Sequence, residues 1–208
     1  MTSPSKTQES ITASNASITS SPPSRRPYKG SCHCGHTRYI AYLTLPPPII
    51  HAKPKSRTST IRLRKCNCTT CHKMSFFHVR LMSSPDDFLL LSPTDPFRDL
   101  SDYTCFEAQI HWFFCGKCGV RCFNLTGEGE LRDVEIEGEG RKKVWTVKRD
   151  GWVEGEGSYL SINAATLEAD QEGLDLREWT EKGWIAYLDT KDEVGEDRLG
   201  KPHPGGMY

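Results

Sequence analysis

Apolar and polar residues alternate with a period of two along much of the chain, which is the pattern of strands with one buried face. From Tyr28 onward, short stretches rich in β-branched and aromatic residues are separated by glycine and proline. A helical pattern occurs only near residues 174–182, so we expect an all-β fold of antiparallel sheets with at most one short C-terminal helix. The pattern predicts strands at residues 38–43, 60–65, 76–82, 88–91, 103–114, 120–125, 143–148 and 159–163.

Three segments fall outside this pattern. Residues 1–27 are dominated by Ser, Thr, Pro and Asn and cannot bury enough apolar surface to offset the entropy of ordering, so we expect a disordered tail. Residues 45–59 contain four prolines, which are unsuited to a central strand, and residues 127–157 are rich in Gly and Glu around a hairpin expected at 141–153. We expect solvated surface for both stretches.

The length of 208 residues fits one hydrophobic core, so we expect a single domain at 28–190 with a C-terminal extension at 191–208. No apolar run approaches the roughly 20 residues of a membrane span, and the N-terminus lacks the apolar block of a secretory signal. The expected protein is soluble and cytoplasmic, with no membrane partner. In such a reducing compartment, nine cysteines favour metal binding over disulfides.

The net charge of zero hides an asymmetry between the two halves of the chain. Residues 1–85 hold 13 of the 27 Lys and Arg and one of the 27 acids, so residues 86–208 hold 14 and 26. The charges are therefore +12 and −12. One interpretation is that the halves neutralise each other when their strands pair. The other is a basic wall around the metal sites, which attracts anions. The basic residues are scattered and no nucleic-acid-reading motif accompanies them, so nucleic acid is an unlikely partner.

The cysteines form three short clusters, and the first and third share one detail. Cys32 and Cys34 are followed by Gly35, and Cys115 and Cys118 are followed by Gly119. Glycine allows the left-handed turn that lets backbone amides approach thiolate sulfur. The four thiolates predict one closed metal site of structural type, with zinc as the expected ion. A redox pair at the C-x-x-C motif is the alternative, but it lacks the usual βαβ context.

The second cluster supplies three closely spaced sulfurs from Cys66, Cys68 and Cys71. Three protein ligands leave a coordination position open, which is the arrangement of a catalytic zinc that can bind water or a substrate thiol. A structural zinc completed by His72, Cys105 or Cys122 remains an alternative, and iron–sulfur ligation has less support. Cys105 and Cys122 lie in strand-like patterns and are expected to be core residues.

These motifs in this order resemble the glutathione-dependent formaldehyde-activating enzyme family, also called the centromere protein V/GFA domain. The resemblance covers residues 28–189, and its motifs are Tyr-Lys-Gly-Ser-Cys-His-Cys-Gly at 28–35, Cys-Asn-Cys-Thr-Thr-Cys at 66–71, Phe-Cys-Gly-Lys-Cys-Gly at 114–119 and, more weakly, Leu-Ser-Ile-Asn-Ala-Ala-Thr-Leu at 160–167. The chain departs from the compact family pattern in its tail, in a proline-rich insertion after Leu43 and in an acidic insertion after Thr126.

The resemblance implies a tent-like complex β-sandwich with two zinc ions. The structural ion would be held by Cys32, Cys34, Cys115 and Cys118, and the catalytic ion by Cys66, Cys68 and Cys71. The implied activity is the formation or cleavage of a carbon–sulfur bond, which joins glutathione and formaldehyde into S-hydroxymethylglutathione.

The leading hypothesis is that the second zinc binds a small thiol, lowers its pKa and presents the thiolate to a small aldehyde. Basic residues near this cluster could balance the anionic centre or hold a substrate carboxylate: Arg62, Arg64, Lys65, Lys73 and Arg80. His72, His78 and His111 are candidate proton carriers, because histidine titrates near neutral pH, but the sequence assigns the role to none of them.

The competing hypothesis is a non-enzymatic zinc module with two structural metals. In that case the basic wall or the segment 202–208 would dock a protein or a nucleic acid. Salt-sensitive nucleic-acid binding would favour this second hypothesis.

Overall fold

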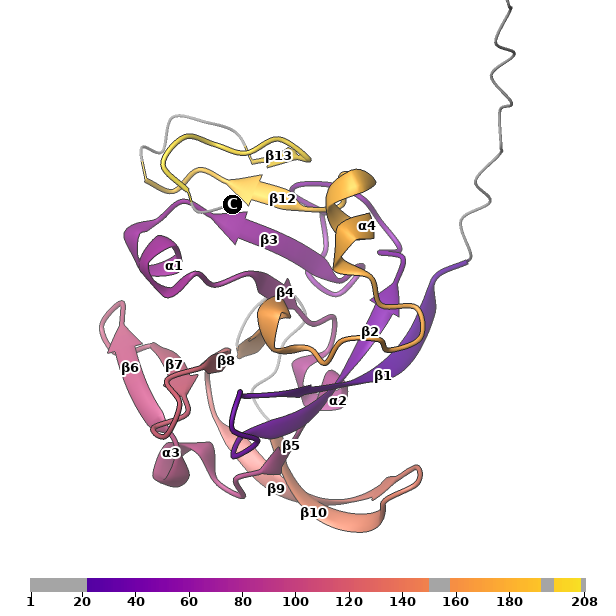
Figure 1. The fold of residues 1–208 in the computed structure, drawn as a ribbon, viewed down its shortest axis with the longest axis vertical. Coiled ribbons are helices and arrows are strands. Elements are labelled where there is room, and N and C mark those ends of the chain that lie inside the picture. The colour runs from indigo at the N-terminus through magenta and orange to yellow at the C-terminus, as the bar shows by residue number, and fades with distance from the viewer. Residues whose placement is uncertain (1–21, 150–157, 192–196, 207–208) are drawn as a thin grey trace, which may run out of the picture.

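The computed structural model describes residues 22–149, 158–191 and 197–206 (Figure 1). The expected strand-rich fold is confirmed, because the described strands form two sheets with no long helix between them. The five-stranded sheet has the order β1 (Ser24–Ser31), β2 (Arg38–Leu45), β5 (Phe88–Ser92), β10 (Gly140–Val147) and β9 (Gly129–Ile136). The eight-stranded sheet has the order β13 (Arg198–Leu199), β12 (Ala186–Leu188), β3 (Arg62–Cys66), β4 (His78–Arg80), β11 (Tyr159–Asn163), β8 (Arg121–Thr126), β7 (Ile110–Phe114) and β6 (Ser101–Cys105).

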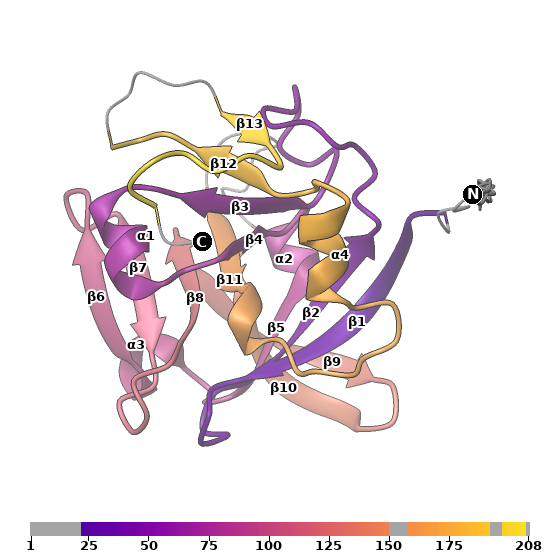
Figure 2. The same cartoon turned by 45° about the horizontal axis from the view of Figure 1, so that its top comes forward.

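Among the described residues, every strand pair except one is antiparallel. β12 pairs with β3 in parallel, although the two strands lie far apart in the sequence. β12 and β13, at one edge of the eight-stranded sheet, lie at one end of the molecule. β9 and β10, at one edge of the five-stranded sheet, lie at the opposite end (Figures 1 and 2). The C-terminal part of the chain therefore completes the sheet beside β3.

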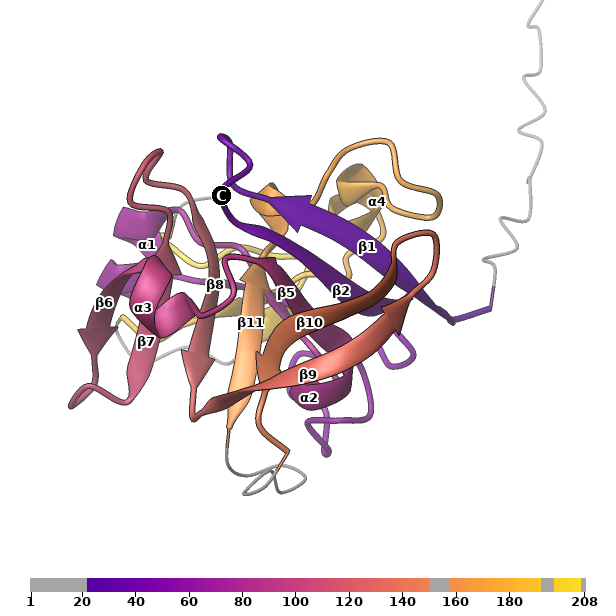
Figure 3. The same ribbon diagram turned by 90° about the horizontal axis from the view of Figure 1, so that it is seen from below.

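The main core lies between the two sheets, as their period-two alternation requires. Leu63 and Val79 of the eight-stranded sheet and Phe88 of the five-stranded sheet belong to one buried apolar cluster. Figure 3 shows the five-stranded sheet curving beneath the other strands. Because Leu63 and Val79 are register partners, Arg62 with Arg80 and Arg64 with His78 lie on the opposite face of the eight-stranded sheet. That second face is polar, and it carries the candidate site described below.

In the described part of the chain, four short α-helices join the strands, where the sequence predicts one: α1 (Thr69–Met74), α2 (Ser84–Asp87), α3 (Pro96–Asp99) and α4 (Leu176–Glu181). The expected helix at 174–182 is α4. The other three have four to six residues, too few to leave a helical period in the sequence. Local signals fix them instead. Pro85 and Pro96 occupy the first turns of α2 and α3, and Cys68 caps α1. A 3₁₀ turn, η1 (Ala164–Thr166), follows β11.

Several expected boundaries differ from the observed ones. β1 begins at Ser24, inside the segment expected to be a disordered tail, while the rest of that tail, residues 1–21, lies outside the described residues. The long strand expected at 103–114 is the hairpin of β6 and β7, because Phe106, Glu107 and Ala108 adopt positive φ and reverse the chain. The hairpin expected at 141–153 turns earlier: β10 pairs with β9 across residues 137–139, and residues 150–153 lie outside the described part. β12 and β13 have no counterpart among the predicted strands.

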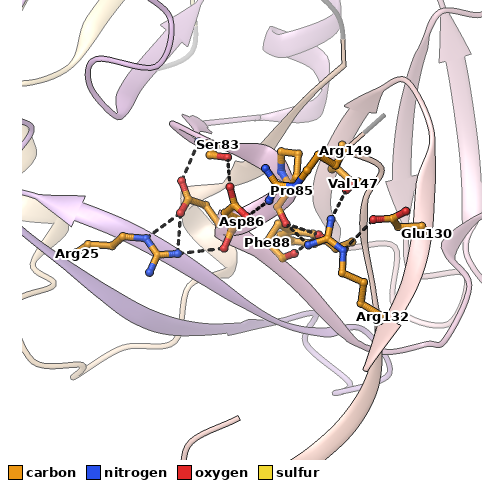
Figure 4. Close-up of polar contacts among 11 residues, drawn as sticks. Arg25, Ser83, Pro85, Asp86, Phe88, Glu130, Arg132, Val147 and Arg149 are labelled. Carbon is orange, nitrogen blue, oxygen red and sulfur yellow. Dashed lines mark hydrogen bonds and ion pairs between the residues drawn. The ribbon is translucent and has the colours of Figure 1, made fainter. Parts of the chain in front are cut away.

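Ion pairs join the basic and acidic halves of the chain in several places. Arg25 of β1 pairs with Asp87 of α2 at 2.9 Å, and Lys29 of β1 lies 3.5 Å from Glu139. Figure 4 shows that Asp86 contacts Arg149 and that Arg132 of β9 donates to the carbonyl of Pro85 at 3.1 Å. These contacts fix α2 between the two edges of the five-stranded sheet. Arg25–Asp87 and Lys29–Glu139 join the basic half to the acidic half, whereas Asp86 and Arg149 both belong to the acidic half.

The proline-rich stretch after β2 contains no strand before β3, in line with its composition. The C-terminal extension packs against the domain where it is described, because β13 pairs with β12 and His203 is 4% exposed. No helix in the described residues is long and apolar enough to span a bilayer.

Candidate metal centres

The first centre joins turns of the two sheets. Cys32 and Cys34 lie in the turn between β1 and β2, and Cys115 and Cys118 lie in the turn between β7 and β8. Their four sulfurs all lie within 4.8 Å of one another, with Cys32–Cys34 at 3.7 Å and Cys34–Cys115 at 3.6 Å. Zinc–sulfur bonds of about 2.3 Å in a tetrahedron put the sulfurs about 3.8 Å apart. The predicted four-cysteine group is therefore brought together, and it could hold a metal ion.

Both turns have the same backbone design. Gly35 and Gly119 have φ of 73° and 75°, as predicted from their place after the last cysteine of each motif. The amide of Cys32 bonds the carbonyl of Thr37 at 3.0 Å, and that of Cys115 bonds the carbonyl of Val120 at 3.0 Å, so each turn closes five residues after its first cysteine. The two turns therefore present their sulfurs with the same backbone geometry.

Backbone amides also favour the thiolate form at this centre. Burial raises the pKa of Cys32, but the amide of Thr37, which donates to its sulfur at 3.2 Å, and the neighbouring Cys34 and Cys115 sulfurs outweigh this effect and bring the pKa to about 6. The backbone amide of Val120 lowers the pKa of Cys118. Metals bind thiolates rather than thiols, so these hydrogen bonds prepare the site for a cation.

The second centre lies at the end of β3 and the start of α1. The sulfurs of Cys66, Cys68 and Cys71 lie within 4.8 Å of one another. Two amides point at them: the Cys68 amide donates to Cys66 Sγ at 3.4 Å, and the Cys71 amide donates to Cys68 Sγ at 3.4 Å. Cys68 is thus the cap of α1, and its pKa is lowered chiefly by hydrogen bonds from the neighbouring Cys66 and Cys71 thiols. This group could hold a second ion.

The residues considered above as a fourth ligand of the second centre are not part of its group of close ligand atoms. Among the described residues, the group of mutually close ligand atoms contains the three cysteines, without His72, Cys105 or Cys122. His72 is exposed, and Cys122 is a core residue with 1% of its surface exposed. Cys105 accepts a hydrogen bond from the indole of Trp112 at 3.1 Å. Among the described residues, the group of close ligand atoms therefore consists of these three cysteines.

Asn67, between the first two cysteines of this centre, anchors it to the C-terminal part of the chain. Its amide donates to Asp189 at 2.7 Å and accepts from the amides of Thr190 and Lys191 at 2.8 and 3.0 Å. Thr190 in turn lies 2.9 Å from Cys66 Sγ. The parallel pairing of β12 with β3 brings these residues to the cysteines. Sequence reasoning missed this role, because the contact spans more than 120 residues.

A pocket of about 390 Å³ opens beside the second centre. Its floor is the polar face of the eight-stranded sheet, and none of the described residues that line it is an acid. Trp112, Ile110 and the exposed Phe106 form an apolar wall. The other lining residues are Arg64, Cys66, Cys68, Thr70, Cys71, His78, Arg80, Asn124, Tyr159, Ser161, Leu188 and Thr190. All three sulfurs of the second centre therefore face a space that can admit a small molecule.

Of the three candidate proton carriers, only His78 lines this pocket. Its Nε2 lies 3.2 Å from Cys71 Sγ and its Nδ1 lies 3.1 Å from Ser161 Oγ. Burial, followed by the charge of Arg64, lowers the pKa of His78 to about 3, so its imidazole is neutral near pH 7. A neutral ring that donates from Nε2 to the sulfur accepts the Ser161 proton at Nδ1. His111 instead pairs with Asp102 at 2.6 Å, away from the pocket.

The five basic residues near the second cluster are divided by the structure. Arg64 and Arg80 line the pocket with the sulfurs. Lys65 lies over the ring of Phe77 at 4.8 Å, and Lys73 is exposed on α1. Arg62 shares the strand and face of Arg64 but does not line the pocket. Of these five basic residues, Arg64 and Arg80 are therefore the two that lie at the pocket.

Comparison with known proteins adds little to this geometry. No family model matches the chain, and no curated protein matches it. A crystal structure of a Rhodobacter sphaeroides protein aligns with a TM-score of 0.40 and 16% identity, over 77% of this chain and 99% of that one. The case for function therefore depends on the two cysteine groups and the pocket.

Proposed function

We propose that the protein is a zinc-dependent carbon–sulfur lyase or synthase that joins a glutathione-type thiol to a small aldehyde, and that it binds two zinc ions per chain. The observation that carries the proposal is the second centre: three sulfurs close to one another, with no fourth ligand among the described residues, on the wall of a pocket. The motif resemblance described above supports the same reaction.

The donor sets fit zinc better than harder ions. Both groups consist of sulfur alone, and backbone amides point at several of the sulfurs. Thiolates select zinc and other soft ions over magnesium or calcium, which prefer oxygen. Cys32, Cys34, Cys115 and Cys118 would hold a structural ion, and Cys66, Cys68 and Cys71 would hold the other. Bound there, zinc supplies a coordination position at which a thiol binds as its thiolate.

The reaction needs no oxidant or reductant. The substrate sulfur attacks the aldehyde carbon, a carbon–sulfur bond forms, and the carbonyl electron pair moves to oxygen, which takes up the proton that the thiol has lost. The reverse reaction breaks the same bond. Ser161 and Asn124 present polar groups to the pocket, while Trp112 and Ile110 exclude water from one side of it.

His78 has a positioning role in this proposal. Its hydrogen bond to Cys71 stabilises that sulfur as a thiolate, and its bond to Ser161 fixes the orientation of the ring. The imidazole makes these bonds in its neutral form, so it stays in place across the physiological pH range.

The test combines metal analysis with turnover. Purified protein should contain two zinc ions, one of which is released when glutathione is added in excess. Exchange NMR of a mixture of glutathione and formaldehyde should show faster adduct formation when the protein is present. Cys68→Ser should keep the fold and the first ion but lose the second ion and the rate enhancement.

Cys105→Ser is the matched control, because Cys105 lies near the centre without belonging to the group of close sulfurs. It should retain both ions and the activity. One zinc per wild-type chain would remove the catalytic half of the proposal. A Cys68→Ser protein that unfolds would instead support two structural metals and the non-enzymatic zinc module.

A further inference from the structure

The pocket holds positive charge that the described residues do not neutralise. Arg80 is 7% exposed, yet its guanidinium contacts the ring of Tyr159 at 4.3 Å and forms no ion pair within the described part of the chain. Arg64 is likewise without a described hydrogen bond or ion pair. The carboxylate that acts most strongly on the Arg64 charge belongs to Asp197. Asp197 already pairs with Lys53 at 3.8 Å. Buried cations are ordinarily paired, so this arrangement calls for an anion.

The arginines also repel one another. Burial, followed by the charges of Arg64 and Arg57, lowers the pKa of Arg80 to about 10. Burial chiefly lowers the pKa of Arg64 as well. Both are taken as cationic near pH 7, because a guanidinium group keeps its proton in proteins. Their proximity has a free-energy cost that an anionic ligand between them would offset.

A third group points to the same ligand. Asn124 is 1% exposed, and both its amide nitrogen and its amide oxygen are buried without a hydrogen-bond partner among the described residues. It lines the pocket together with Arg80, and the register of β11 places Ser161 opposite both of them. A buried amide with no hydrogen-bond partner destabilises the folded state. Such groups in native proteins are typical of sites that a ligand completes.

We propose that Arg64, Arg80 and Asn124 form a carboxylate-binding subsite, so that the substrate that meets the second metal centre carries a carboxylate. For its thiol and aldehyde chemistry this inference rests on the proposed function. The guanidinium groups would donate to the carboxylate oxygens, the amide nitrogen of Asn124 would add a donor, and the wall of Ile110 and Trp112 would contact the carbon chain.

The charge balance favours a monoanion such as a carboxylate. Two arginines contribute +2, and a zinc ion held by three thiolates contributes −1, which leaves +1 in the pocket. A substrate thiolate on that ion brings the sum to 0, and one carboxylate brings it to −1. A phosphate dianion would make it more negative still beside an already anionic metal centre.

The test compares two thiols of similar size, mercaptoacetate and 2-mercaptoethanol, by calorimetric titration of the two-zinc protein. The wild type should bind mercaptoacetate at least about tenfold more tightly. Arg64→Gln and Arg80→Gln should each reduce that preference to under about threefold, and the ratio of the two affinities cancels any general effect of the lost charge on thiolate binding. Lys73→Gln removes the same charge from exposed surface on α1 and should keep the preference.

Asn124→Leu provides an independent check that does not change the charge. Because the amide is buried and unpaired, its replacement by an apolar side chain of similar size should raise the melting temperature while it weakens mercaptoacetate binding. A merely structural Asn124 would not show these opposite shifts. This variant also keeps the proposal testable if an arginine variant fails to fold.

The carboxylate could belong to the aldehyde instead of the thiol. A second pair of titrations, glyoxylate against acetaldehyde, separates the two cases, and a preference in either pair supports the subsite. Equal affinity within both pairs, or a preference that survives Arg64→Gln and Arg80→Gln, overturns it. Absence of turnover with a retained preference would contradict the proposed reaction alone, and turnover without any preference would contradict the subsite alone.

Discussion

Cys34 and Cys115 come from hairpin turns in different sheets, and their sulfur atoms lie 3.6 Å apart. An ion bound by them and their two partners would link the five-stranded sheet to the eight-stranded sheet at one end of the core. The second group of sulfurs lies within the short stretch of chain from the end of β3 to α1. The two centres therefore differ in what their loss should do.

Cys115→Ser should unfold the protein or leave it insoluble. A closed zinc site contributes on the order of 10 kcal/mol to folding, which is comparable with the whole stability of a domain. Circular dichroism and zinc content would measure the effect. Cys122→Ala, which changes a buried cysteine outside both groups, should cost about 1 kcal/mol and keep two ions. A folded Cys115→Ser protein with two ions would contradict the assignment.

Gly35→Ala should weaken the first centre through the backbone. A side chain there meets nothing within 4 Å, but φ of 73° costs an L-residue about 1–2 kcal/mol. Gly138 has φ of 75° and equally open surroundings in the turn of β9 and β10. Gly138→Ala should therefore show the same loss of stability in urea, while only Gly35→Ala lowers zinc affinity. Equal zinc affinities would mean that the turn does not position the sulfurs.

Asn67→Ala should loosen the second centre by releasing the C-terminal part of the chain. The amide side chain contacts Asp189, Pro204 and the amides of Thr190 and Lys191, and we expect a loss of about 2–3 kcal/mol. Hydrogen exchange should report faster exchange at the Thr190 and Lys191 amides, accompanied by weaker binding of the second zinc. Unchanged protection of those two amides would count against this role.

Stability should fall at alkaline pH because of Tyr39. Burial raises the pKa of this fully buried phenol above its ordinary value of 10, even though it shares a hydrogen bond of 2.8 Å with Thr166. The folded state keeps the phenolic proton where the unfolded state loses it. The stabilisation is thus complete below pH 10 and declines by about 1.4 kcal/mol per unit above it.

The comparison of wild type with Tyr39→Phe isolates this effect from the titration of the cysteines. Phenylalanine cannot ionise, so the difference in unfolding free energy between the two proteins should be constant from pH 8 to about 10 and shrink above that. A constant difference up to pH 11 would show that the phenol ionises normally in the folded protein.

Much of the arrangement of the cysteines could be predicted from the sequence, because each cluster is a short local motif. Both sulfur groups, the left-handed Gly35 and Gly119, and the buried position of Cys122 follow from short motifs or strand patterns. The all-β class follows from the period-two alternation for the same reason. Zinc itself, the reaction and its substrates stay predictions.

The pocket could not be predicted, because register assembles it from strands that are distant in sequence. Asn124 and Ser161 become neighbours only when β8 pairs with β11, and Trp112 joins them through β7. None of the three belongs to a sequence motif that marks it as part of a pocket. The signal that could have found Asn124 is an amide in the run Cys-Phe-Asn-Leu of an otherwise buried strand.

The parallel pairing of β12 with β3 fixes an order of assembly during synthesis on the ribosome. All four sulfurs of the first centre have been translated once Cys118 is made, so the link between the sheets can form early. The loop of the second centre is held by Asp189 and Thr190, which leave the ribosome some seventy residues later. During synthesis, the link between the two sheets can therefore form well before the cysteines of the second centre are held in place beside the pocket.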